Sequence, residues 1–373
     1  MSISITPAEE QAIGRLAPRK LHQIFTLPAT DKHEALKVSY SIAGPEAGED
    51  VPTILFCGGM FGGRWLAPWH NFYAEKERVR LIFIDRPGFG GSTPVAISRR
   101  IPTFLETVPA LFSHLRIPHI HLASHSSGTI FALNLLTHRP DLLYPDNPTV
   151  TFFSPWVHQS ITSVSFLSLA AILPNSLLNN WDSITGFMML KASPAFASSS
   201  GAISAITGSF KGSLSKEEEG KKRAEEDRKC RECYGMTLKE KEELDKIVFK
   251  FAFAENTKGG NDEARLCLKS VEGCHWDACE DYEACVLKLK GDWEKRVQEG
   301  GKKLKVKIIF GEEDAMIGVK GRNYWDNCWT DQRCGGGMEA VCMEVGTGNH
   351  DSVLDYTKGG IQELYKAVKA ERI

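Results

Sequence analysis

The chain has 373 residues, of which 42% are hydrophobic and 25% are charged, and its formal net charge is -2 at pH 7. This length suits one large α/β domain with an insertion, or two domains. The charge balance gives no indication of a nucleic-acid surface. We find no signal peptide, no apolar run of membrane-spanning length and no common sorting signal, so we expect a cytoplasmic protein without an integral membrane segment.

The first part of the chain alternates predicted strands and helices. Residues 21–27 and 35–42 alternate polar and apolar side chains with period two, which predicts an antiparallel pair at the edge of a sheet. Continuous apolar runs, typical of strands buried on both faces, then appear at 52–57 and 79–84. The first of these runs leads into the glycine-rich loop 58–63. Helices are expected near 65–77 and 103–115.

A strand that turns directly into a helix lies at His121–Ile130. Small residues flank a central Ser126, which is the pattern of a nucleophile elbow. Glycine is usual at both flanking positions; here Gly128 occupies the second and Ser124 replaces the glycine at the first. Such small residues are needed because the serine sits on a strained turn. The start of the helix adds backbone N–H groups and a partial positive field, both suited to a developing oxyanion.

After a further strand at 149–153 the alternation stops until about residue 300. This part contains no buried strand of the earlier kind. The parallel pattern resumes at 304–310 and 340–345, so we interpret the intervening part as a helical insertion rather than as a second independent domain. Helical stretches within it are expected at 166–173, 177–190, 216–231, 238–253 and 280–297.

The combination of motifs resembles the α/β-hydrolase superfamily, in its serine-nucleophile type with a helical cap after the sixth strand. The motifs are the glycine loop 58–63, the turn Gly88-x-Gly90-x-Ser92, the elbow, Gly311-x-x-Asp314 and a late His350. The resemblance covers about residues 20–156 and 300–370. It implies a mostly parallel eight-stranded sheet with helices on both faces, a core of residues 1–156 and 300–373, and a cap of residues 157–299.

Three residues can be assigned to the chemistry of this family. A serine hydroxyl is a weak nucleophile until a base takes its proton, and histidine titrates in the range that allows this. A carboxylate is needed to fix the tautomer of the base. We therefore expect Ser126 to be the nucleophile, His350 the base and Asp314 the orienting acid. Asp314 and His350 each follow a strand, so both should lie at the same sheet edge as Ser126.

Other residues compete for these roles. Glu312 and Glu313 share the loop of Asp314, and the family spacing from Gly311 selects Asp314 among them. Some members of the family place the acid after the sixth strand, but Ser154-Pro155-Trp156 offers no carboxylate there. The remaining candidates are expected to be packed neighbours, structural residues or surface groups: His119, His121, His125 and Asp351.

The resemblance also implies an oxyanion hole. It would use the backbone N–H of Ser127 and one N–H of the glycine loop, from Gly59 or Met60; the choice stays open because the family often has histidine where Cys57 stands. The side chains expected to line the substrate site are Phe61, His125 and Trp156. Apolar residues of the insertion either wall an acyl pocket or form its own core: Phe166, Leu167, Leu169, Ile172, Trp181, Phe187, Met188 and Met189.

These assignments predict a serine hydrolase that cleaves a carboxylic ester, thioester or lactone of a small to medium apolar substrate. An acyltransferase or lyase with the same three residues and a non-catalytic ligand-binding protein are the alternatives. The sequence contains 10 cysteines, and Cys230-x-x-Cys233 leaves a zinc site as an alternative to ordinary thiols. We expect free thiols, no metal and no cofactor.

Overall fold

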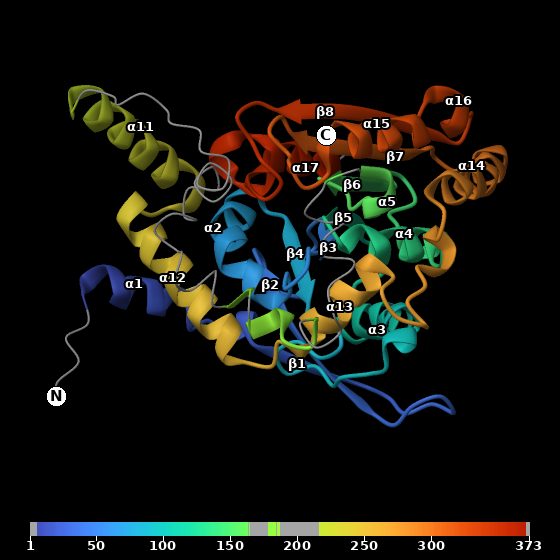
Figure 1. Cartoon of the computed structure of the whole chain (residues 1–373), viewed down its shortest axis with the longest axis horizontal. Helices are drawn as coiled ribbons and strands as arrows, with labels where there is room; N and C mark the ends of the chain where they lie inside the picture. The colour runs from blue at the N-terminus through green and yellow to red at the C-terminus, as the bar shows by residue number, and fades with distance from the viewer. Residues whose placement is uncertain (1–5, 163, 165–177, 184, 187–215, 371–373) are drawn as a thin grey trace.

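The computed structural model describes residues 6–162, 164, 178–183, 185–186 and 216–370. Its centre is an eight-stranded sheet with the order β1-β2-β4-β3-β5-β6-β7-β8 (Figure 1). The pairs β1–β2 and β2–β4 are antiparallel, and all other neighbours in the sheet are parallel. The predicted mostly parallel sheet with an antiparallel edge pair is therefore confirmed.

The strands follow the predicted apolar runs. Residues of β3 to β6 are buried throughout, as expected for parallel strands covered on both faces. The strand β8 begins two residues before the predicted range 340–345. The bounds are β1 Gln23–Leu27, β2 Leu36–Ala43, β3 Thr53–Cys57, β4 Arg80–Ile84, β5 His121–His125, β6 Thr149–Phe153, β7 Leu304–Gly311 and β8 Met338–Val345.

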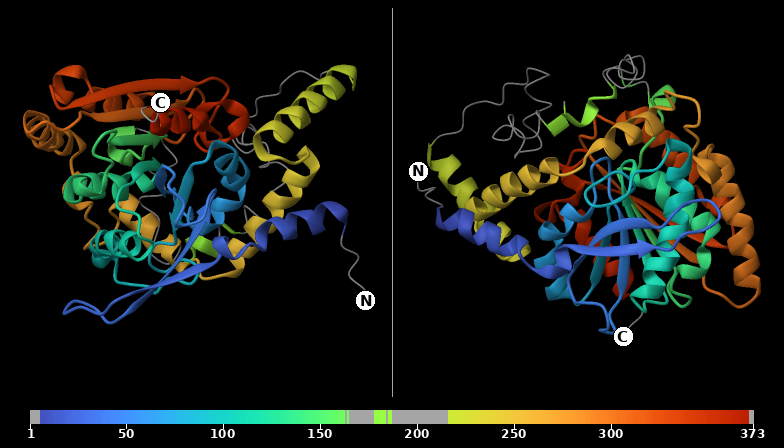
Figure 2. Two further views of the ribbon diagram at one scale, coloured as in Figure 1. Left: turned by 180° about the vertical axis from the view of Figure 1, so that it is seen from behind. Right: turned by 90° about the horizontal axis from the view of Figure 1, so that it is seen from below.

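Helices cover both faces of the sheet (Figure 2). A separate apolar core lies under each layer of helices. One core joins the sheet to α3 (Arg100–His114), α4 (Gly128–His138), α14 (Tyr282–Gln298) and α15 (Gly318–Cys328). The other joins it to α1 (Pro7–Leu16), α2 (Ala67–Glu77), α11 (Lys216–Tyr234), α12 (Leu238–Ala254) and α17 (Gly360–Lys369). This two-sided arrangement leaves the carboxyl ends of the parallel strands free to carry a site.

The chain between β6 and β7 is helical where it is described. It contains α5 (Gln159–Thr162), α11, α12, α13 (Lys258–Leu268) and α14, and the short α16 (Asp331–Cys334) precedes β8. The predicted helical insertion after β6 is thus confirmed, while the exact division at residues 157 and 299 stays a prediction. Among the described helices, none has the length and apolar character needed to cross a membrane.

Besides the one-turn helices α5 and α16, two longer described helices were not predicted from the sequence. The N-terminal α1 carries a complete capping box, with Thr6 and Glu9 bonded reciprocally, which is a readable start signal. The helix α13 begins with Lys258, Gly259 and Gly260, and paired glycines disfavour a helix. Its glycines meet a packing need instead, because a Cβ on Gly259 would lie 2.7 Å from the carbonyl oxygen of Pro87.

Candidate active site

Ser126 lies on a sharp turn between β5 and α4. Its φ is +48°, in the left-handed region that non-glycine residues rarely adopt. Its N–H donates to the carbonyl of Phe153 at 3.1 Å, and its own carbonyl accepts from Trp156 N at 3.2 Å. These bonds to the end of β6 hold the strained turn in place. Ser124, which stands where glycine is usual, is buried, and its hydroxyl lies 3.5 Å from that of Thr129.

The first residue of α4 must be a glycine. A Cβ on Gly128 would lie 1.9 Å from the carbonyl oxygen of Cys57. We expect Gly128→Ala to lower the free energy of unfolding by about 3 kcal/mol, because the β3 backbone would have to move. Chemical denaturation measures this loss. In Gly14→Ala, the control, a Cβ meets nothing within 4 Å, and this variant should be slightly stabilised; equal stability of the two variants would contradict the steric argument.

His350 and Asp314 reach Ser126 from the loops after β8 and β7. His350 Nε2 lies 2.8 Å from Ser126 Oγ, and His350 Nδ1 lies 2.9 Å from Asp314 Oδ2. Asp314 Oδ1 also accepts the N–H groups of Met316 and Ile317 at 3.1 and 3.0 Å. The structure therefore brings the three predicted residues into one continuous chain of hydrogen bonds.

Burial and mutual attraction set the charges of this pair. Both side chains are nearly inaccessible to solvent. Burial alone would raise the pKa of Asp314, but the charge and hydrogen bond of His350 lower it to about 2. Burial alone would lower the pKa of His350, but Asp314 raises it above its ordinary value. The carboxylate is thus ionised at neutral pH and favours the protonated imidazole.

The rival candidates lie elsewhere. Glu312 accepts the N–H of Thr347 at 3.1 Å, and Glu313 is exposed. Asp351 is 73% exposed. His121 stacks on Tyr144 with a centroid distance of 4.5 Å. Ser126 Oγ is bonded instead to His350, and His350 to Asp314, so the geometry favours Asp314 and His350 among the candidates of the sequence.

The glycine loop after β3 lies directly beside Ser126. The strands β3 and β5 pair in parallel up to Cys57 and Ser124, so their following residues are neighbours. A Cβ on Gly59 would lie 3.3 Å from Ser126 Cβ. Within the described part of the chain, the N–H groups of Gly59, Met60 and Ser127 donate no hydrogen bond. These three predicted donors therefore have N–H groups available beside the serine.

The residues predicted to line the substrate site differ in position. The ring of Phe61 lies among aromatic rings, 5.9 Å from Phe89 and 5.4 Å from Phe253. Trp156 is buried, and its backbone N–H donates to the carbonyl of Ser126. His125 is buried as well, and its Nε2 lies 2.9 Å from the carbonyl oxygen of His350. A part in substrate binding stays a prediction for Phe61, His125 and Trp156.

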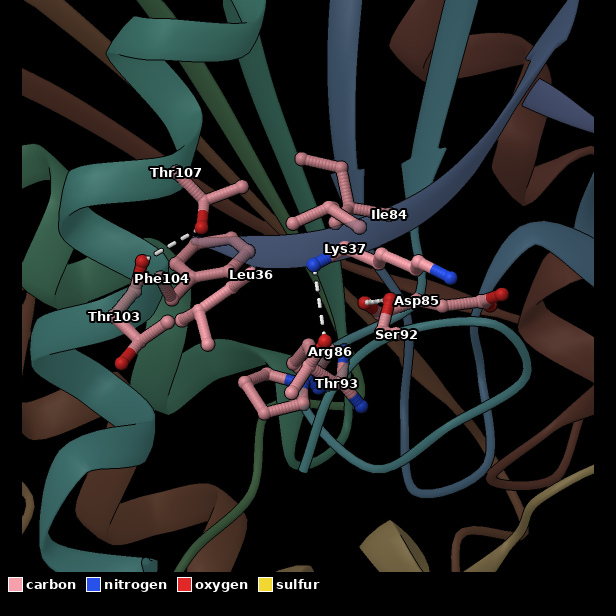
Figure 3. A pocket seen from close by; sticks show the side chains of 12 residues that line it. Leu36, Lys37, Ile84, Asp85, Arg86, Ser92, Thr93, Thr103, Phe104 and Thr107 are labelled. Carbon is pink, nitrogen blue, oxygen red and sulfur yellow. Dashed lines mark hydrogen bonds between the residues drawn. The ribbon is translucent and has the colours of Figure 1, made fainter. Parts of the chain in front are cut away.

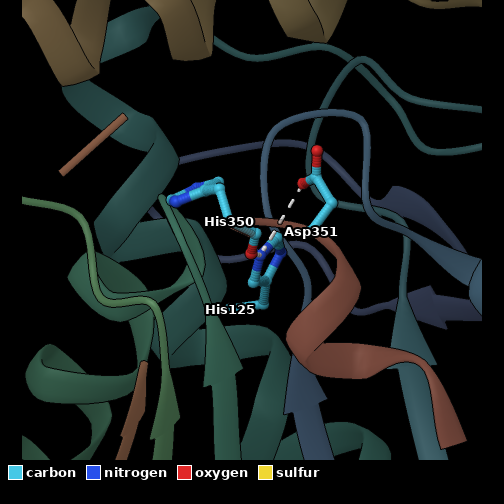
Figure 4. Close-up of side chains that lie close together, drawn as sticks. All are labelled: His125, His350 and Asp351. Carbon is cyan, nitrogen blue, oxygen red and sulfur yellow. Dashed lines mark hydrogen bonds and ion pairs between the residues drawn. The ribbon is translucent and has the colours of Figure 1, made fainter. Parts of the chain in front are cut away.

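His125, His350 and Asp351 gather closely enough to invite comparison with a metal site (Figure 4). One potential ligand atom from each lies within 4.8 Å of the others. Both ring nitrogens of His350 are already engaged with Ser126 and Asp314, however. Burial, and then the nearby His350, lower the pKa of His125. A neutral His125 suits a hydrogen-bond donor to the His350 carbonyl. Within the described chain the cysteines form no such cluster.

Two cavities of the described structure lie away from Ser126. The first, of about 10 Å³, lies between β2, α3 and the turn after β4, where Arg86 and Asp85 appear (Figure 3). It has room for about one water molecule. The second, of about 330 Å³, opens beside β1 and includes Arg64 and Glu255.

Of the residues predicted to wall an acyl pocket, these lie outside the described residues: Phe166, Leu167, Leu169, Ile172, Phe187, Met188 and Met189.

Two charged residues near the site were not singled out from the sequence. Arg86 and Glu263 form a buried ion pair beneath the glycine loop. For Arg86 a signal existed, since it belongs to the charged pair Asp85-Arg86 that follows the buried strand β4. For Glu263 there was none, because its helix was itself not predicted.

Comparisons with known proteins place this geometry in a wider context. No protein-family model matches the chain. The (E)-2-((N-methylformamido)methylene)succinate hydrolase of Acinetobacter baylyi is 30% identical over 99 residues, which are 26% of this chain and 36% of that protein. A dihydrolipoyllysine-residue acetyltransferase component of the acetoin cleaving system of Pseudomonas putida is 38% identical over 95 residues, or 25% and 24%. The match thus spans about a third or less of these curated relatives.

Solved structures match over almost the whole chain. A carboxylesterase of Nitrososphaera gargenis is 12% identical with a TM-score of 0.53, covering 94% of this chain and 100% of its own. An esterase of Thermogutta terrifontis is 13% identical with a TM-score of 0.52, covering 93% and 97%. A bacterial membrane phospholipase A is 13% identical with a TM-score of 0.54, covering 98% and 92%. The sheet order, the insertion after β6 and these matches show that the chain has the α/β-hydrolase fold.

Proposed function

We propose that the protein is a serine hydrolase that cleaves a carboxylic ester, thioester or lactone of a small to medium apolar substrate. The observation that carries this proposal is the unbroken hydrogen-bond chain from Ser126 through His350 to Asp314. A serine held 2.8 Å from a histidine that is itself oriented by a buried carboxylate is the arrangement of an activated nucleophile.

In the proposed reaction, Ser126 Oγ attacks the substrate carbonyl carbon while His350 Nε2 takes its proton. Asp314 stabilises the imidazolium that forms. The oxyanion accepts hydrogen bonds from the N–H of Ser127 and from that of Gly59 or Met60. The bond from that carbon to the alcohol oxygen, or to the thiol sulfur of a thioester, then breaks, and His350 returns the proton to the leaving group. Water, deprotonated by His350, hydrolyses the acyl-enzyme. No cofactor takes part.

An acyl transfer with the same residues is the second candidate. One of the relatives, whose similarity extends over 25% of this chain, is an acetyltransferase component by name. In that reaction an alcohol, amine or thiol would replace water in the second step. The nature of the nucleophile disfavours haloalkane or epoxide chemistry, because Ser126 supplies a hydroxyl where those reactions of the fold use a carboxylate.

The experiment is a panel of p-nitrophenyl esters with acyl chains of increasing length, assayed with the full chain. The proposal expects turnover for at least one short or medium chain. Adding an alcohol such as methanol separates the candidates, since a transferase would form the methyl ester at the expense of the free acid. Absence of turnover across the panel by folded protein would contradict the proposed substrate class.

The raised pKa of His350 predicts the pH dependence of this reaction. Only neutral imidazole accepts the serine proton, so kcat/KM should fall as the pH decreases through the pKa of His350. Because Asp314 raises that pKa above its ordinary value of 6.5, the acid limb should lie above pH 6.5. Asp314→Asn removes the negative charge that raises the pKa of His350, so the acid limb of kcat/KM should move to lower pH. An unmoved limb in this variant, measured as kcat/KM against pH, would contradict the assignment of the pair.

A further inference from the structure

Each of the three side-chain nitrogens of Arg86 donates a hydrogen bond to the glycine loop or to Glu263. Its side chain is fully buried at the end of β4. Nη1 donates to the carbonyl of Gly58 at 2.8 Å, and Nη2 donates to that of Gly59 at 2.7 Å. Nε and Nη2 donate to the two carboxylate oxygens of Glu263. Such a fork of donors is rigid, so it fixes the two carbonyls and the carboxylate relative to one another.

Holding these carbonyls also fixes the neighbouring N–H groups. In a planar trans peptide the carbonyl oxygen of one residue and the N–H of the next point in opposite directions. The carbonyls of Gly58 and Gly59 face the guanidinium, so the N–H groups of Gly59 and Met60 face away from it. These are the loop N–H groups that donate no hydrogen bond within the described residues. Arg86 thus sets the orientation of the predicted oxyanion donors.

Glu263 reaches this position from the insertion. Its side chain is fully buried and bonds both to Arg86 and to Arg100 Nη2, the latter at 2.9 Å. Burial alone would raise the pKa of Glu263, but Arg86 and then Arg100 lower it below its ordinary value. The carboxylate therefore stays charged. Because a buried charge is stable only while it is paired, Glu263 and Arg86 depend on each other.

The helix that carries Glu263 is docked closely on the loops around the site. The N–H of Gly259 donates to the carbonyl of Gly88 at 3.0 Å. A Cβ on Gly260 would lie 2.1 Å from the ring of Phe61, so only glycine allows this contact. The start of α13 therefore packs against the turn after β4 and against the glycine loop at the same time, and this docking places Glu263.

We propose that Arg86 and Glu263 are positioning residues for the oxyanion hole. Glu263, supplied by the insertion, fixes Arg86. Arg86 holds the carbonyls of Gly58 and Gly59 so that the N–H groups of Gly59 and Met60 are presented to the reacting carbonyl oxygen. Through Glu263, the insertion then contributes to the arrangement of the catalytic apparatus. This inference rests on the proposed serine hydrolase function.

The test compares Arg86→Lys and Glu263→Gln with Arg100→Lys in the full chain. A lysine keeps the charge but cannot hold two carbonyls and a carboxylate at once, and a glutamine keeps the shape of Glu263 without its charge. The assay is hydrolysis of the best p-nitrophenyl ester, with kcat normalised to the active sites titrated by a fluorophosphonate. We expect kcat to fall about 10- to 1000-fold in both variants, as on loss of an oxyanion donor.

Three readouts separate positioning from a general loss of stability. KM should stay within about threefold, because the donors act on the transition state. The acid limb of kcat/KM should not move, because the His350–Asp314 pair is untouched. Arg100 bonds Glu263 and the carbonyl of Pro87 but has no contact with the loop carbonyls. Arg100→Lys should therefore lose a similar amount of thermal stability while its kcat stays within about threefold of wild type.

Several results would overturn the inference. These are wild-type kcat in folded Arg86→Lys and Glu263→Gln, a rise in KM with unchanged kcat, or an equal fall of kcat in Arg100→Lys. If Arg86→Lys does not fold, Glu263→Gln decides by the same criteria. Failure of the proposed function would look different, because wild-type protein itself would then show no labelling or turnover that depends on Ser126.

Discussion

Replacing Ser126 by alanine is expected to lower kcat/KM by about ten-thousand- to a million-fold. The loss should be this large because the hydroxyl forms the acyl-enzyme, and no other group can take its place once it is removed. His350 and Asp314 would still be in place but would have no nucleophile to activate. Steady-state hydrolysis of the best ester of the panel, with the folded state checked by circular dichroism, measures the effect.

Ser124→Ala is the matched control for this variant. Ser124 is also buried and lies at the end of β5, but its hydroxyl faces Thr129 rather than His350. Its activity should remain within about tenfold of wild type, since most single substitutions of this kind have small effects. If Ser126→Ala kept wild-type activity while folded, or if both variants lost the same amount, Ser126 would not be the nucleophile.

Asp314→Asn is expected to lower kcat by about ten-thousand-fold. Its side chain is isosteric, and its oxygen can still accept the N–H groups of Met316 and Ile317. The amide nitrogen, however, would face His350 Nδ1 and favour the tautomer that carries its proton on Nε2. That nitrogen could then not accept the proton of Ser126. The measurement is kcat at saturating substrate.

Glu313→Gln provides the control for the acid. Glu313 is adjacent to Asp314, carries the same charge and is exposed. Its loss should change kcat less than about threefold and should leave the acid limb of the pH profile in place, because an exposed charge is well screened. A large loss in Glu313→Gln together with a small one in Asp314→Asn would reassign the orienting acid within this loop.

The sequence predicts the sheet and the three central residues because both depend on local patterns. Apolar runs locate β3 to β7 to within a residue or two. Small residues on either side of Ser126 mark the elbow, and the structure shows that Gly128 leaves no space for a Cβ. Asp314 and His350 each follow a strand, and parallel pairing of β7 with β8 brings their loops together. Chain order and strand ends therefore suffice to join residues far apart in sequence.

The ion pair beneath the site could not be predicted in the same way. Glu263 belongs to α13, whose opening glycines argue against a helix when local propensity alone is considered. Those glycines are explained by tertiary contacts with Gly88 and Phe61, which no local pattern reveals. The pairing of Glu263 with Arg86 spans 177 positions of the chain. A buried salt bridge over such a separation depends on the completed fold.

The most direct test of the central claim is to label the full-length protein with a fluorophosphonate and to map the adduct by mass spectrometry. We predict one adduct, on the peptide that contains Ser126, with no labelling of Ser126→Ala and greatly slowed labelling of Asp314→Asn. An adduct on a different serine, or equal labelling of wild type and Ser126→Ala, would contradict the claim that Ser126, His350 and Asp314 form the catalytic centre.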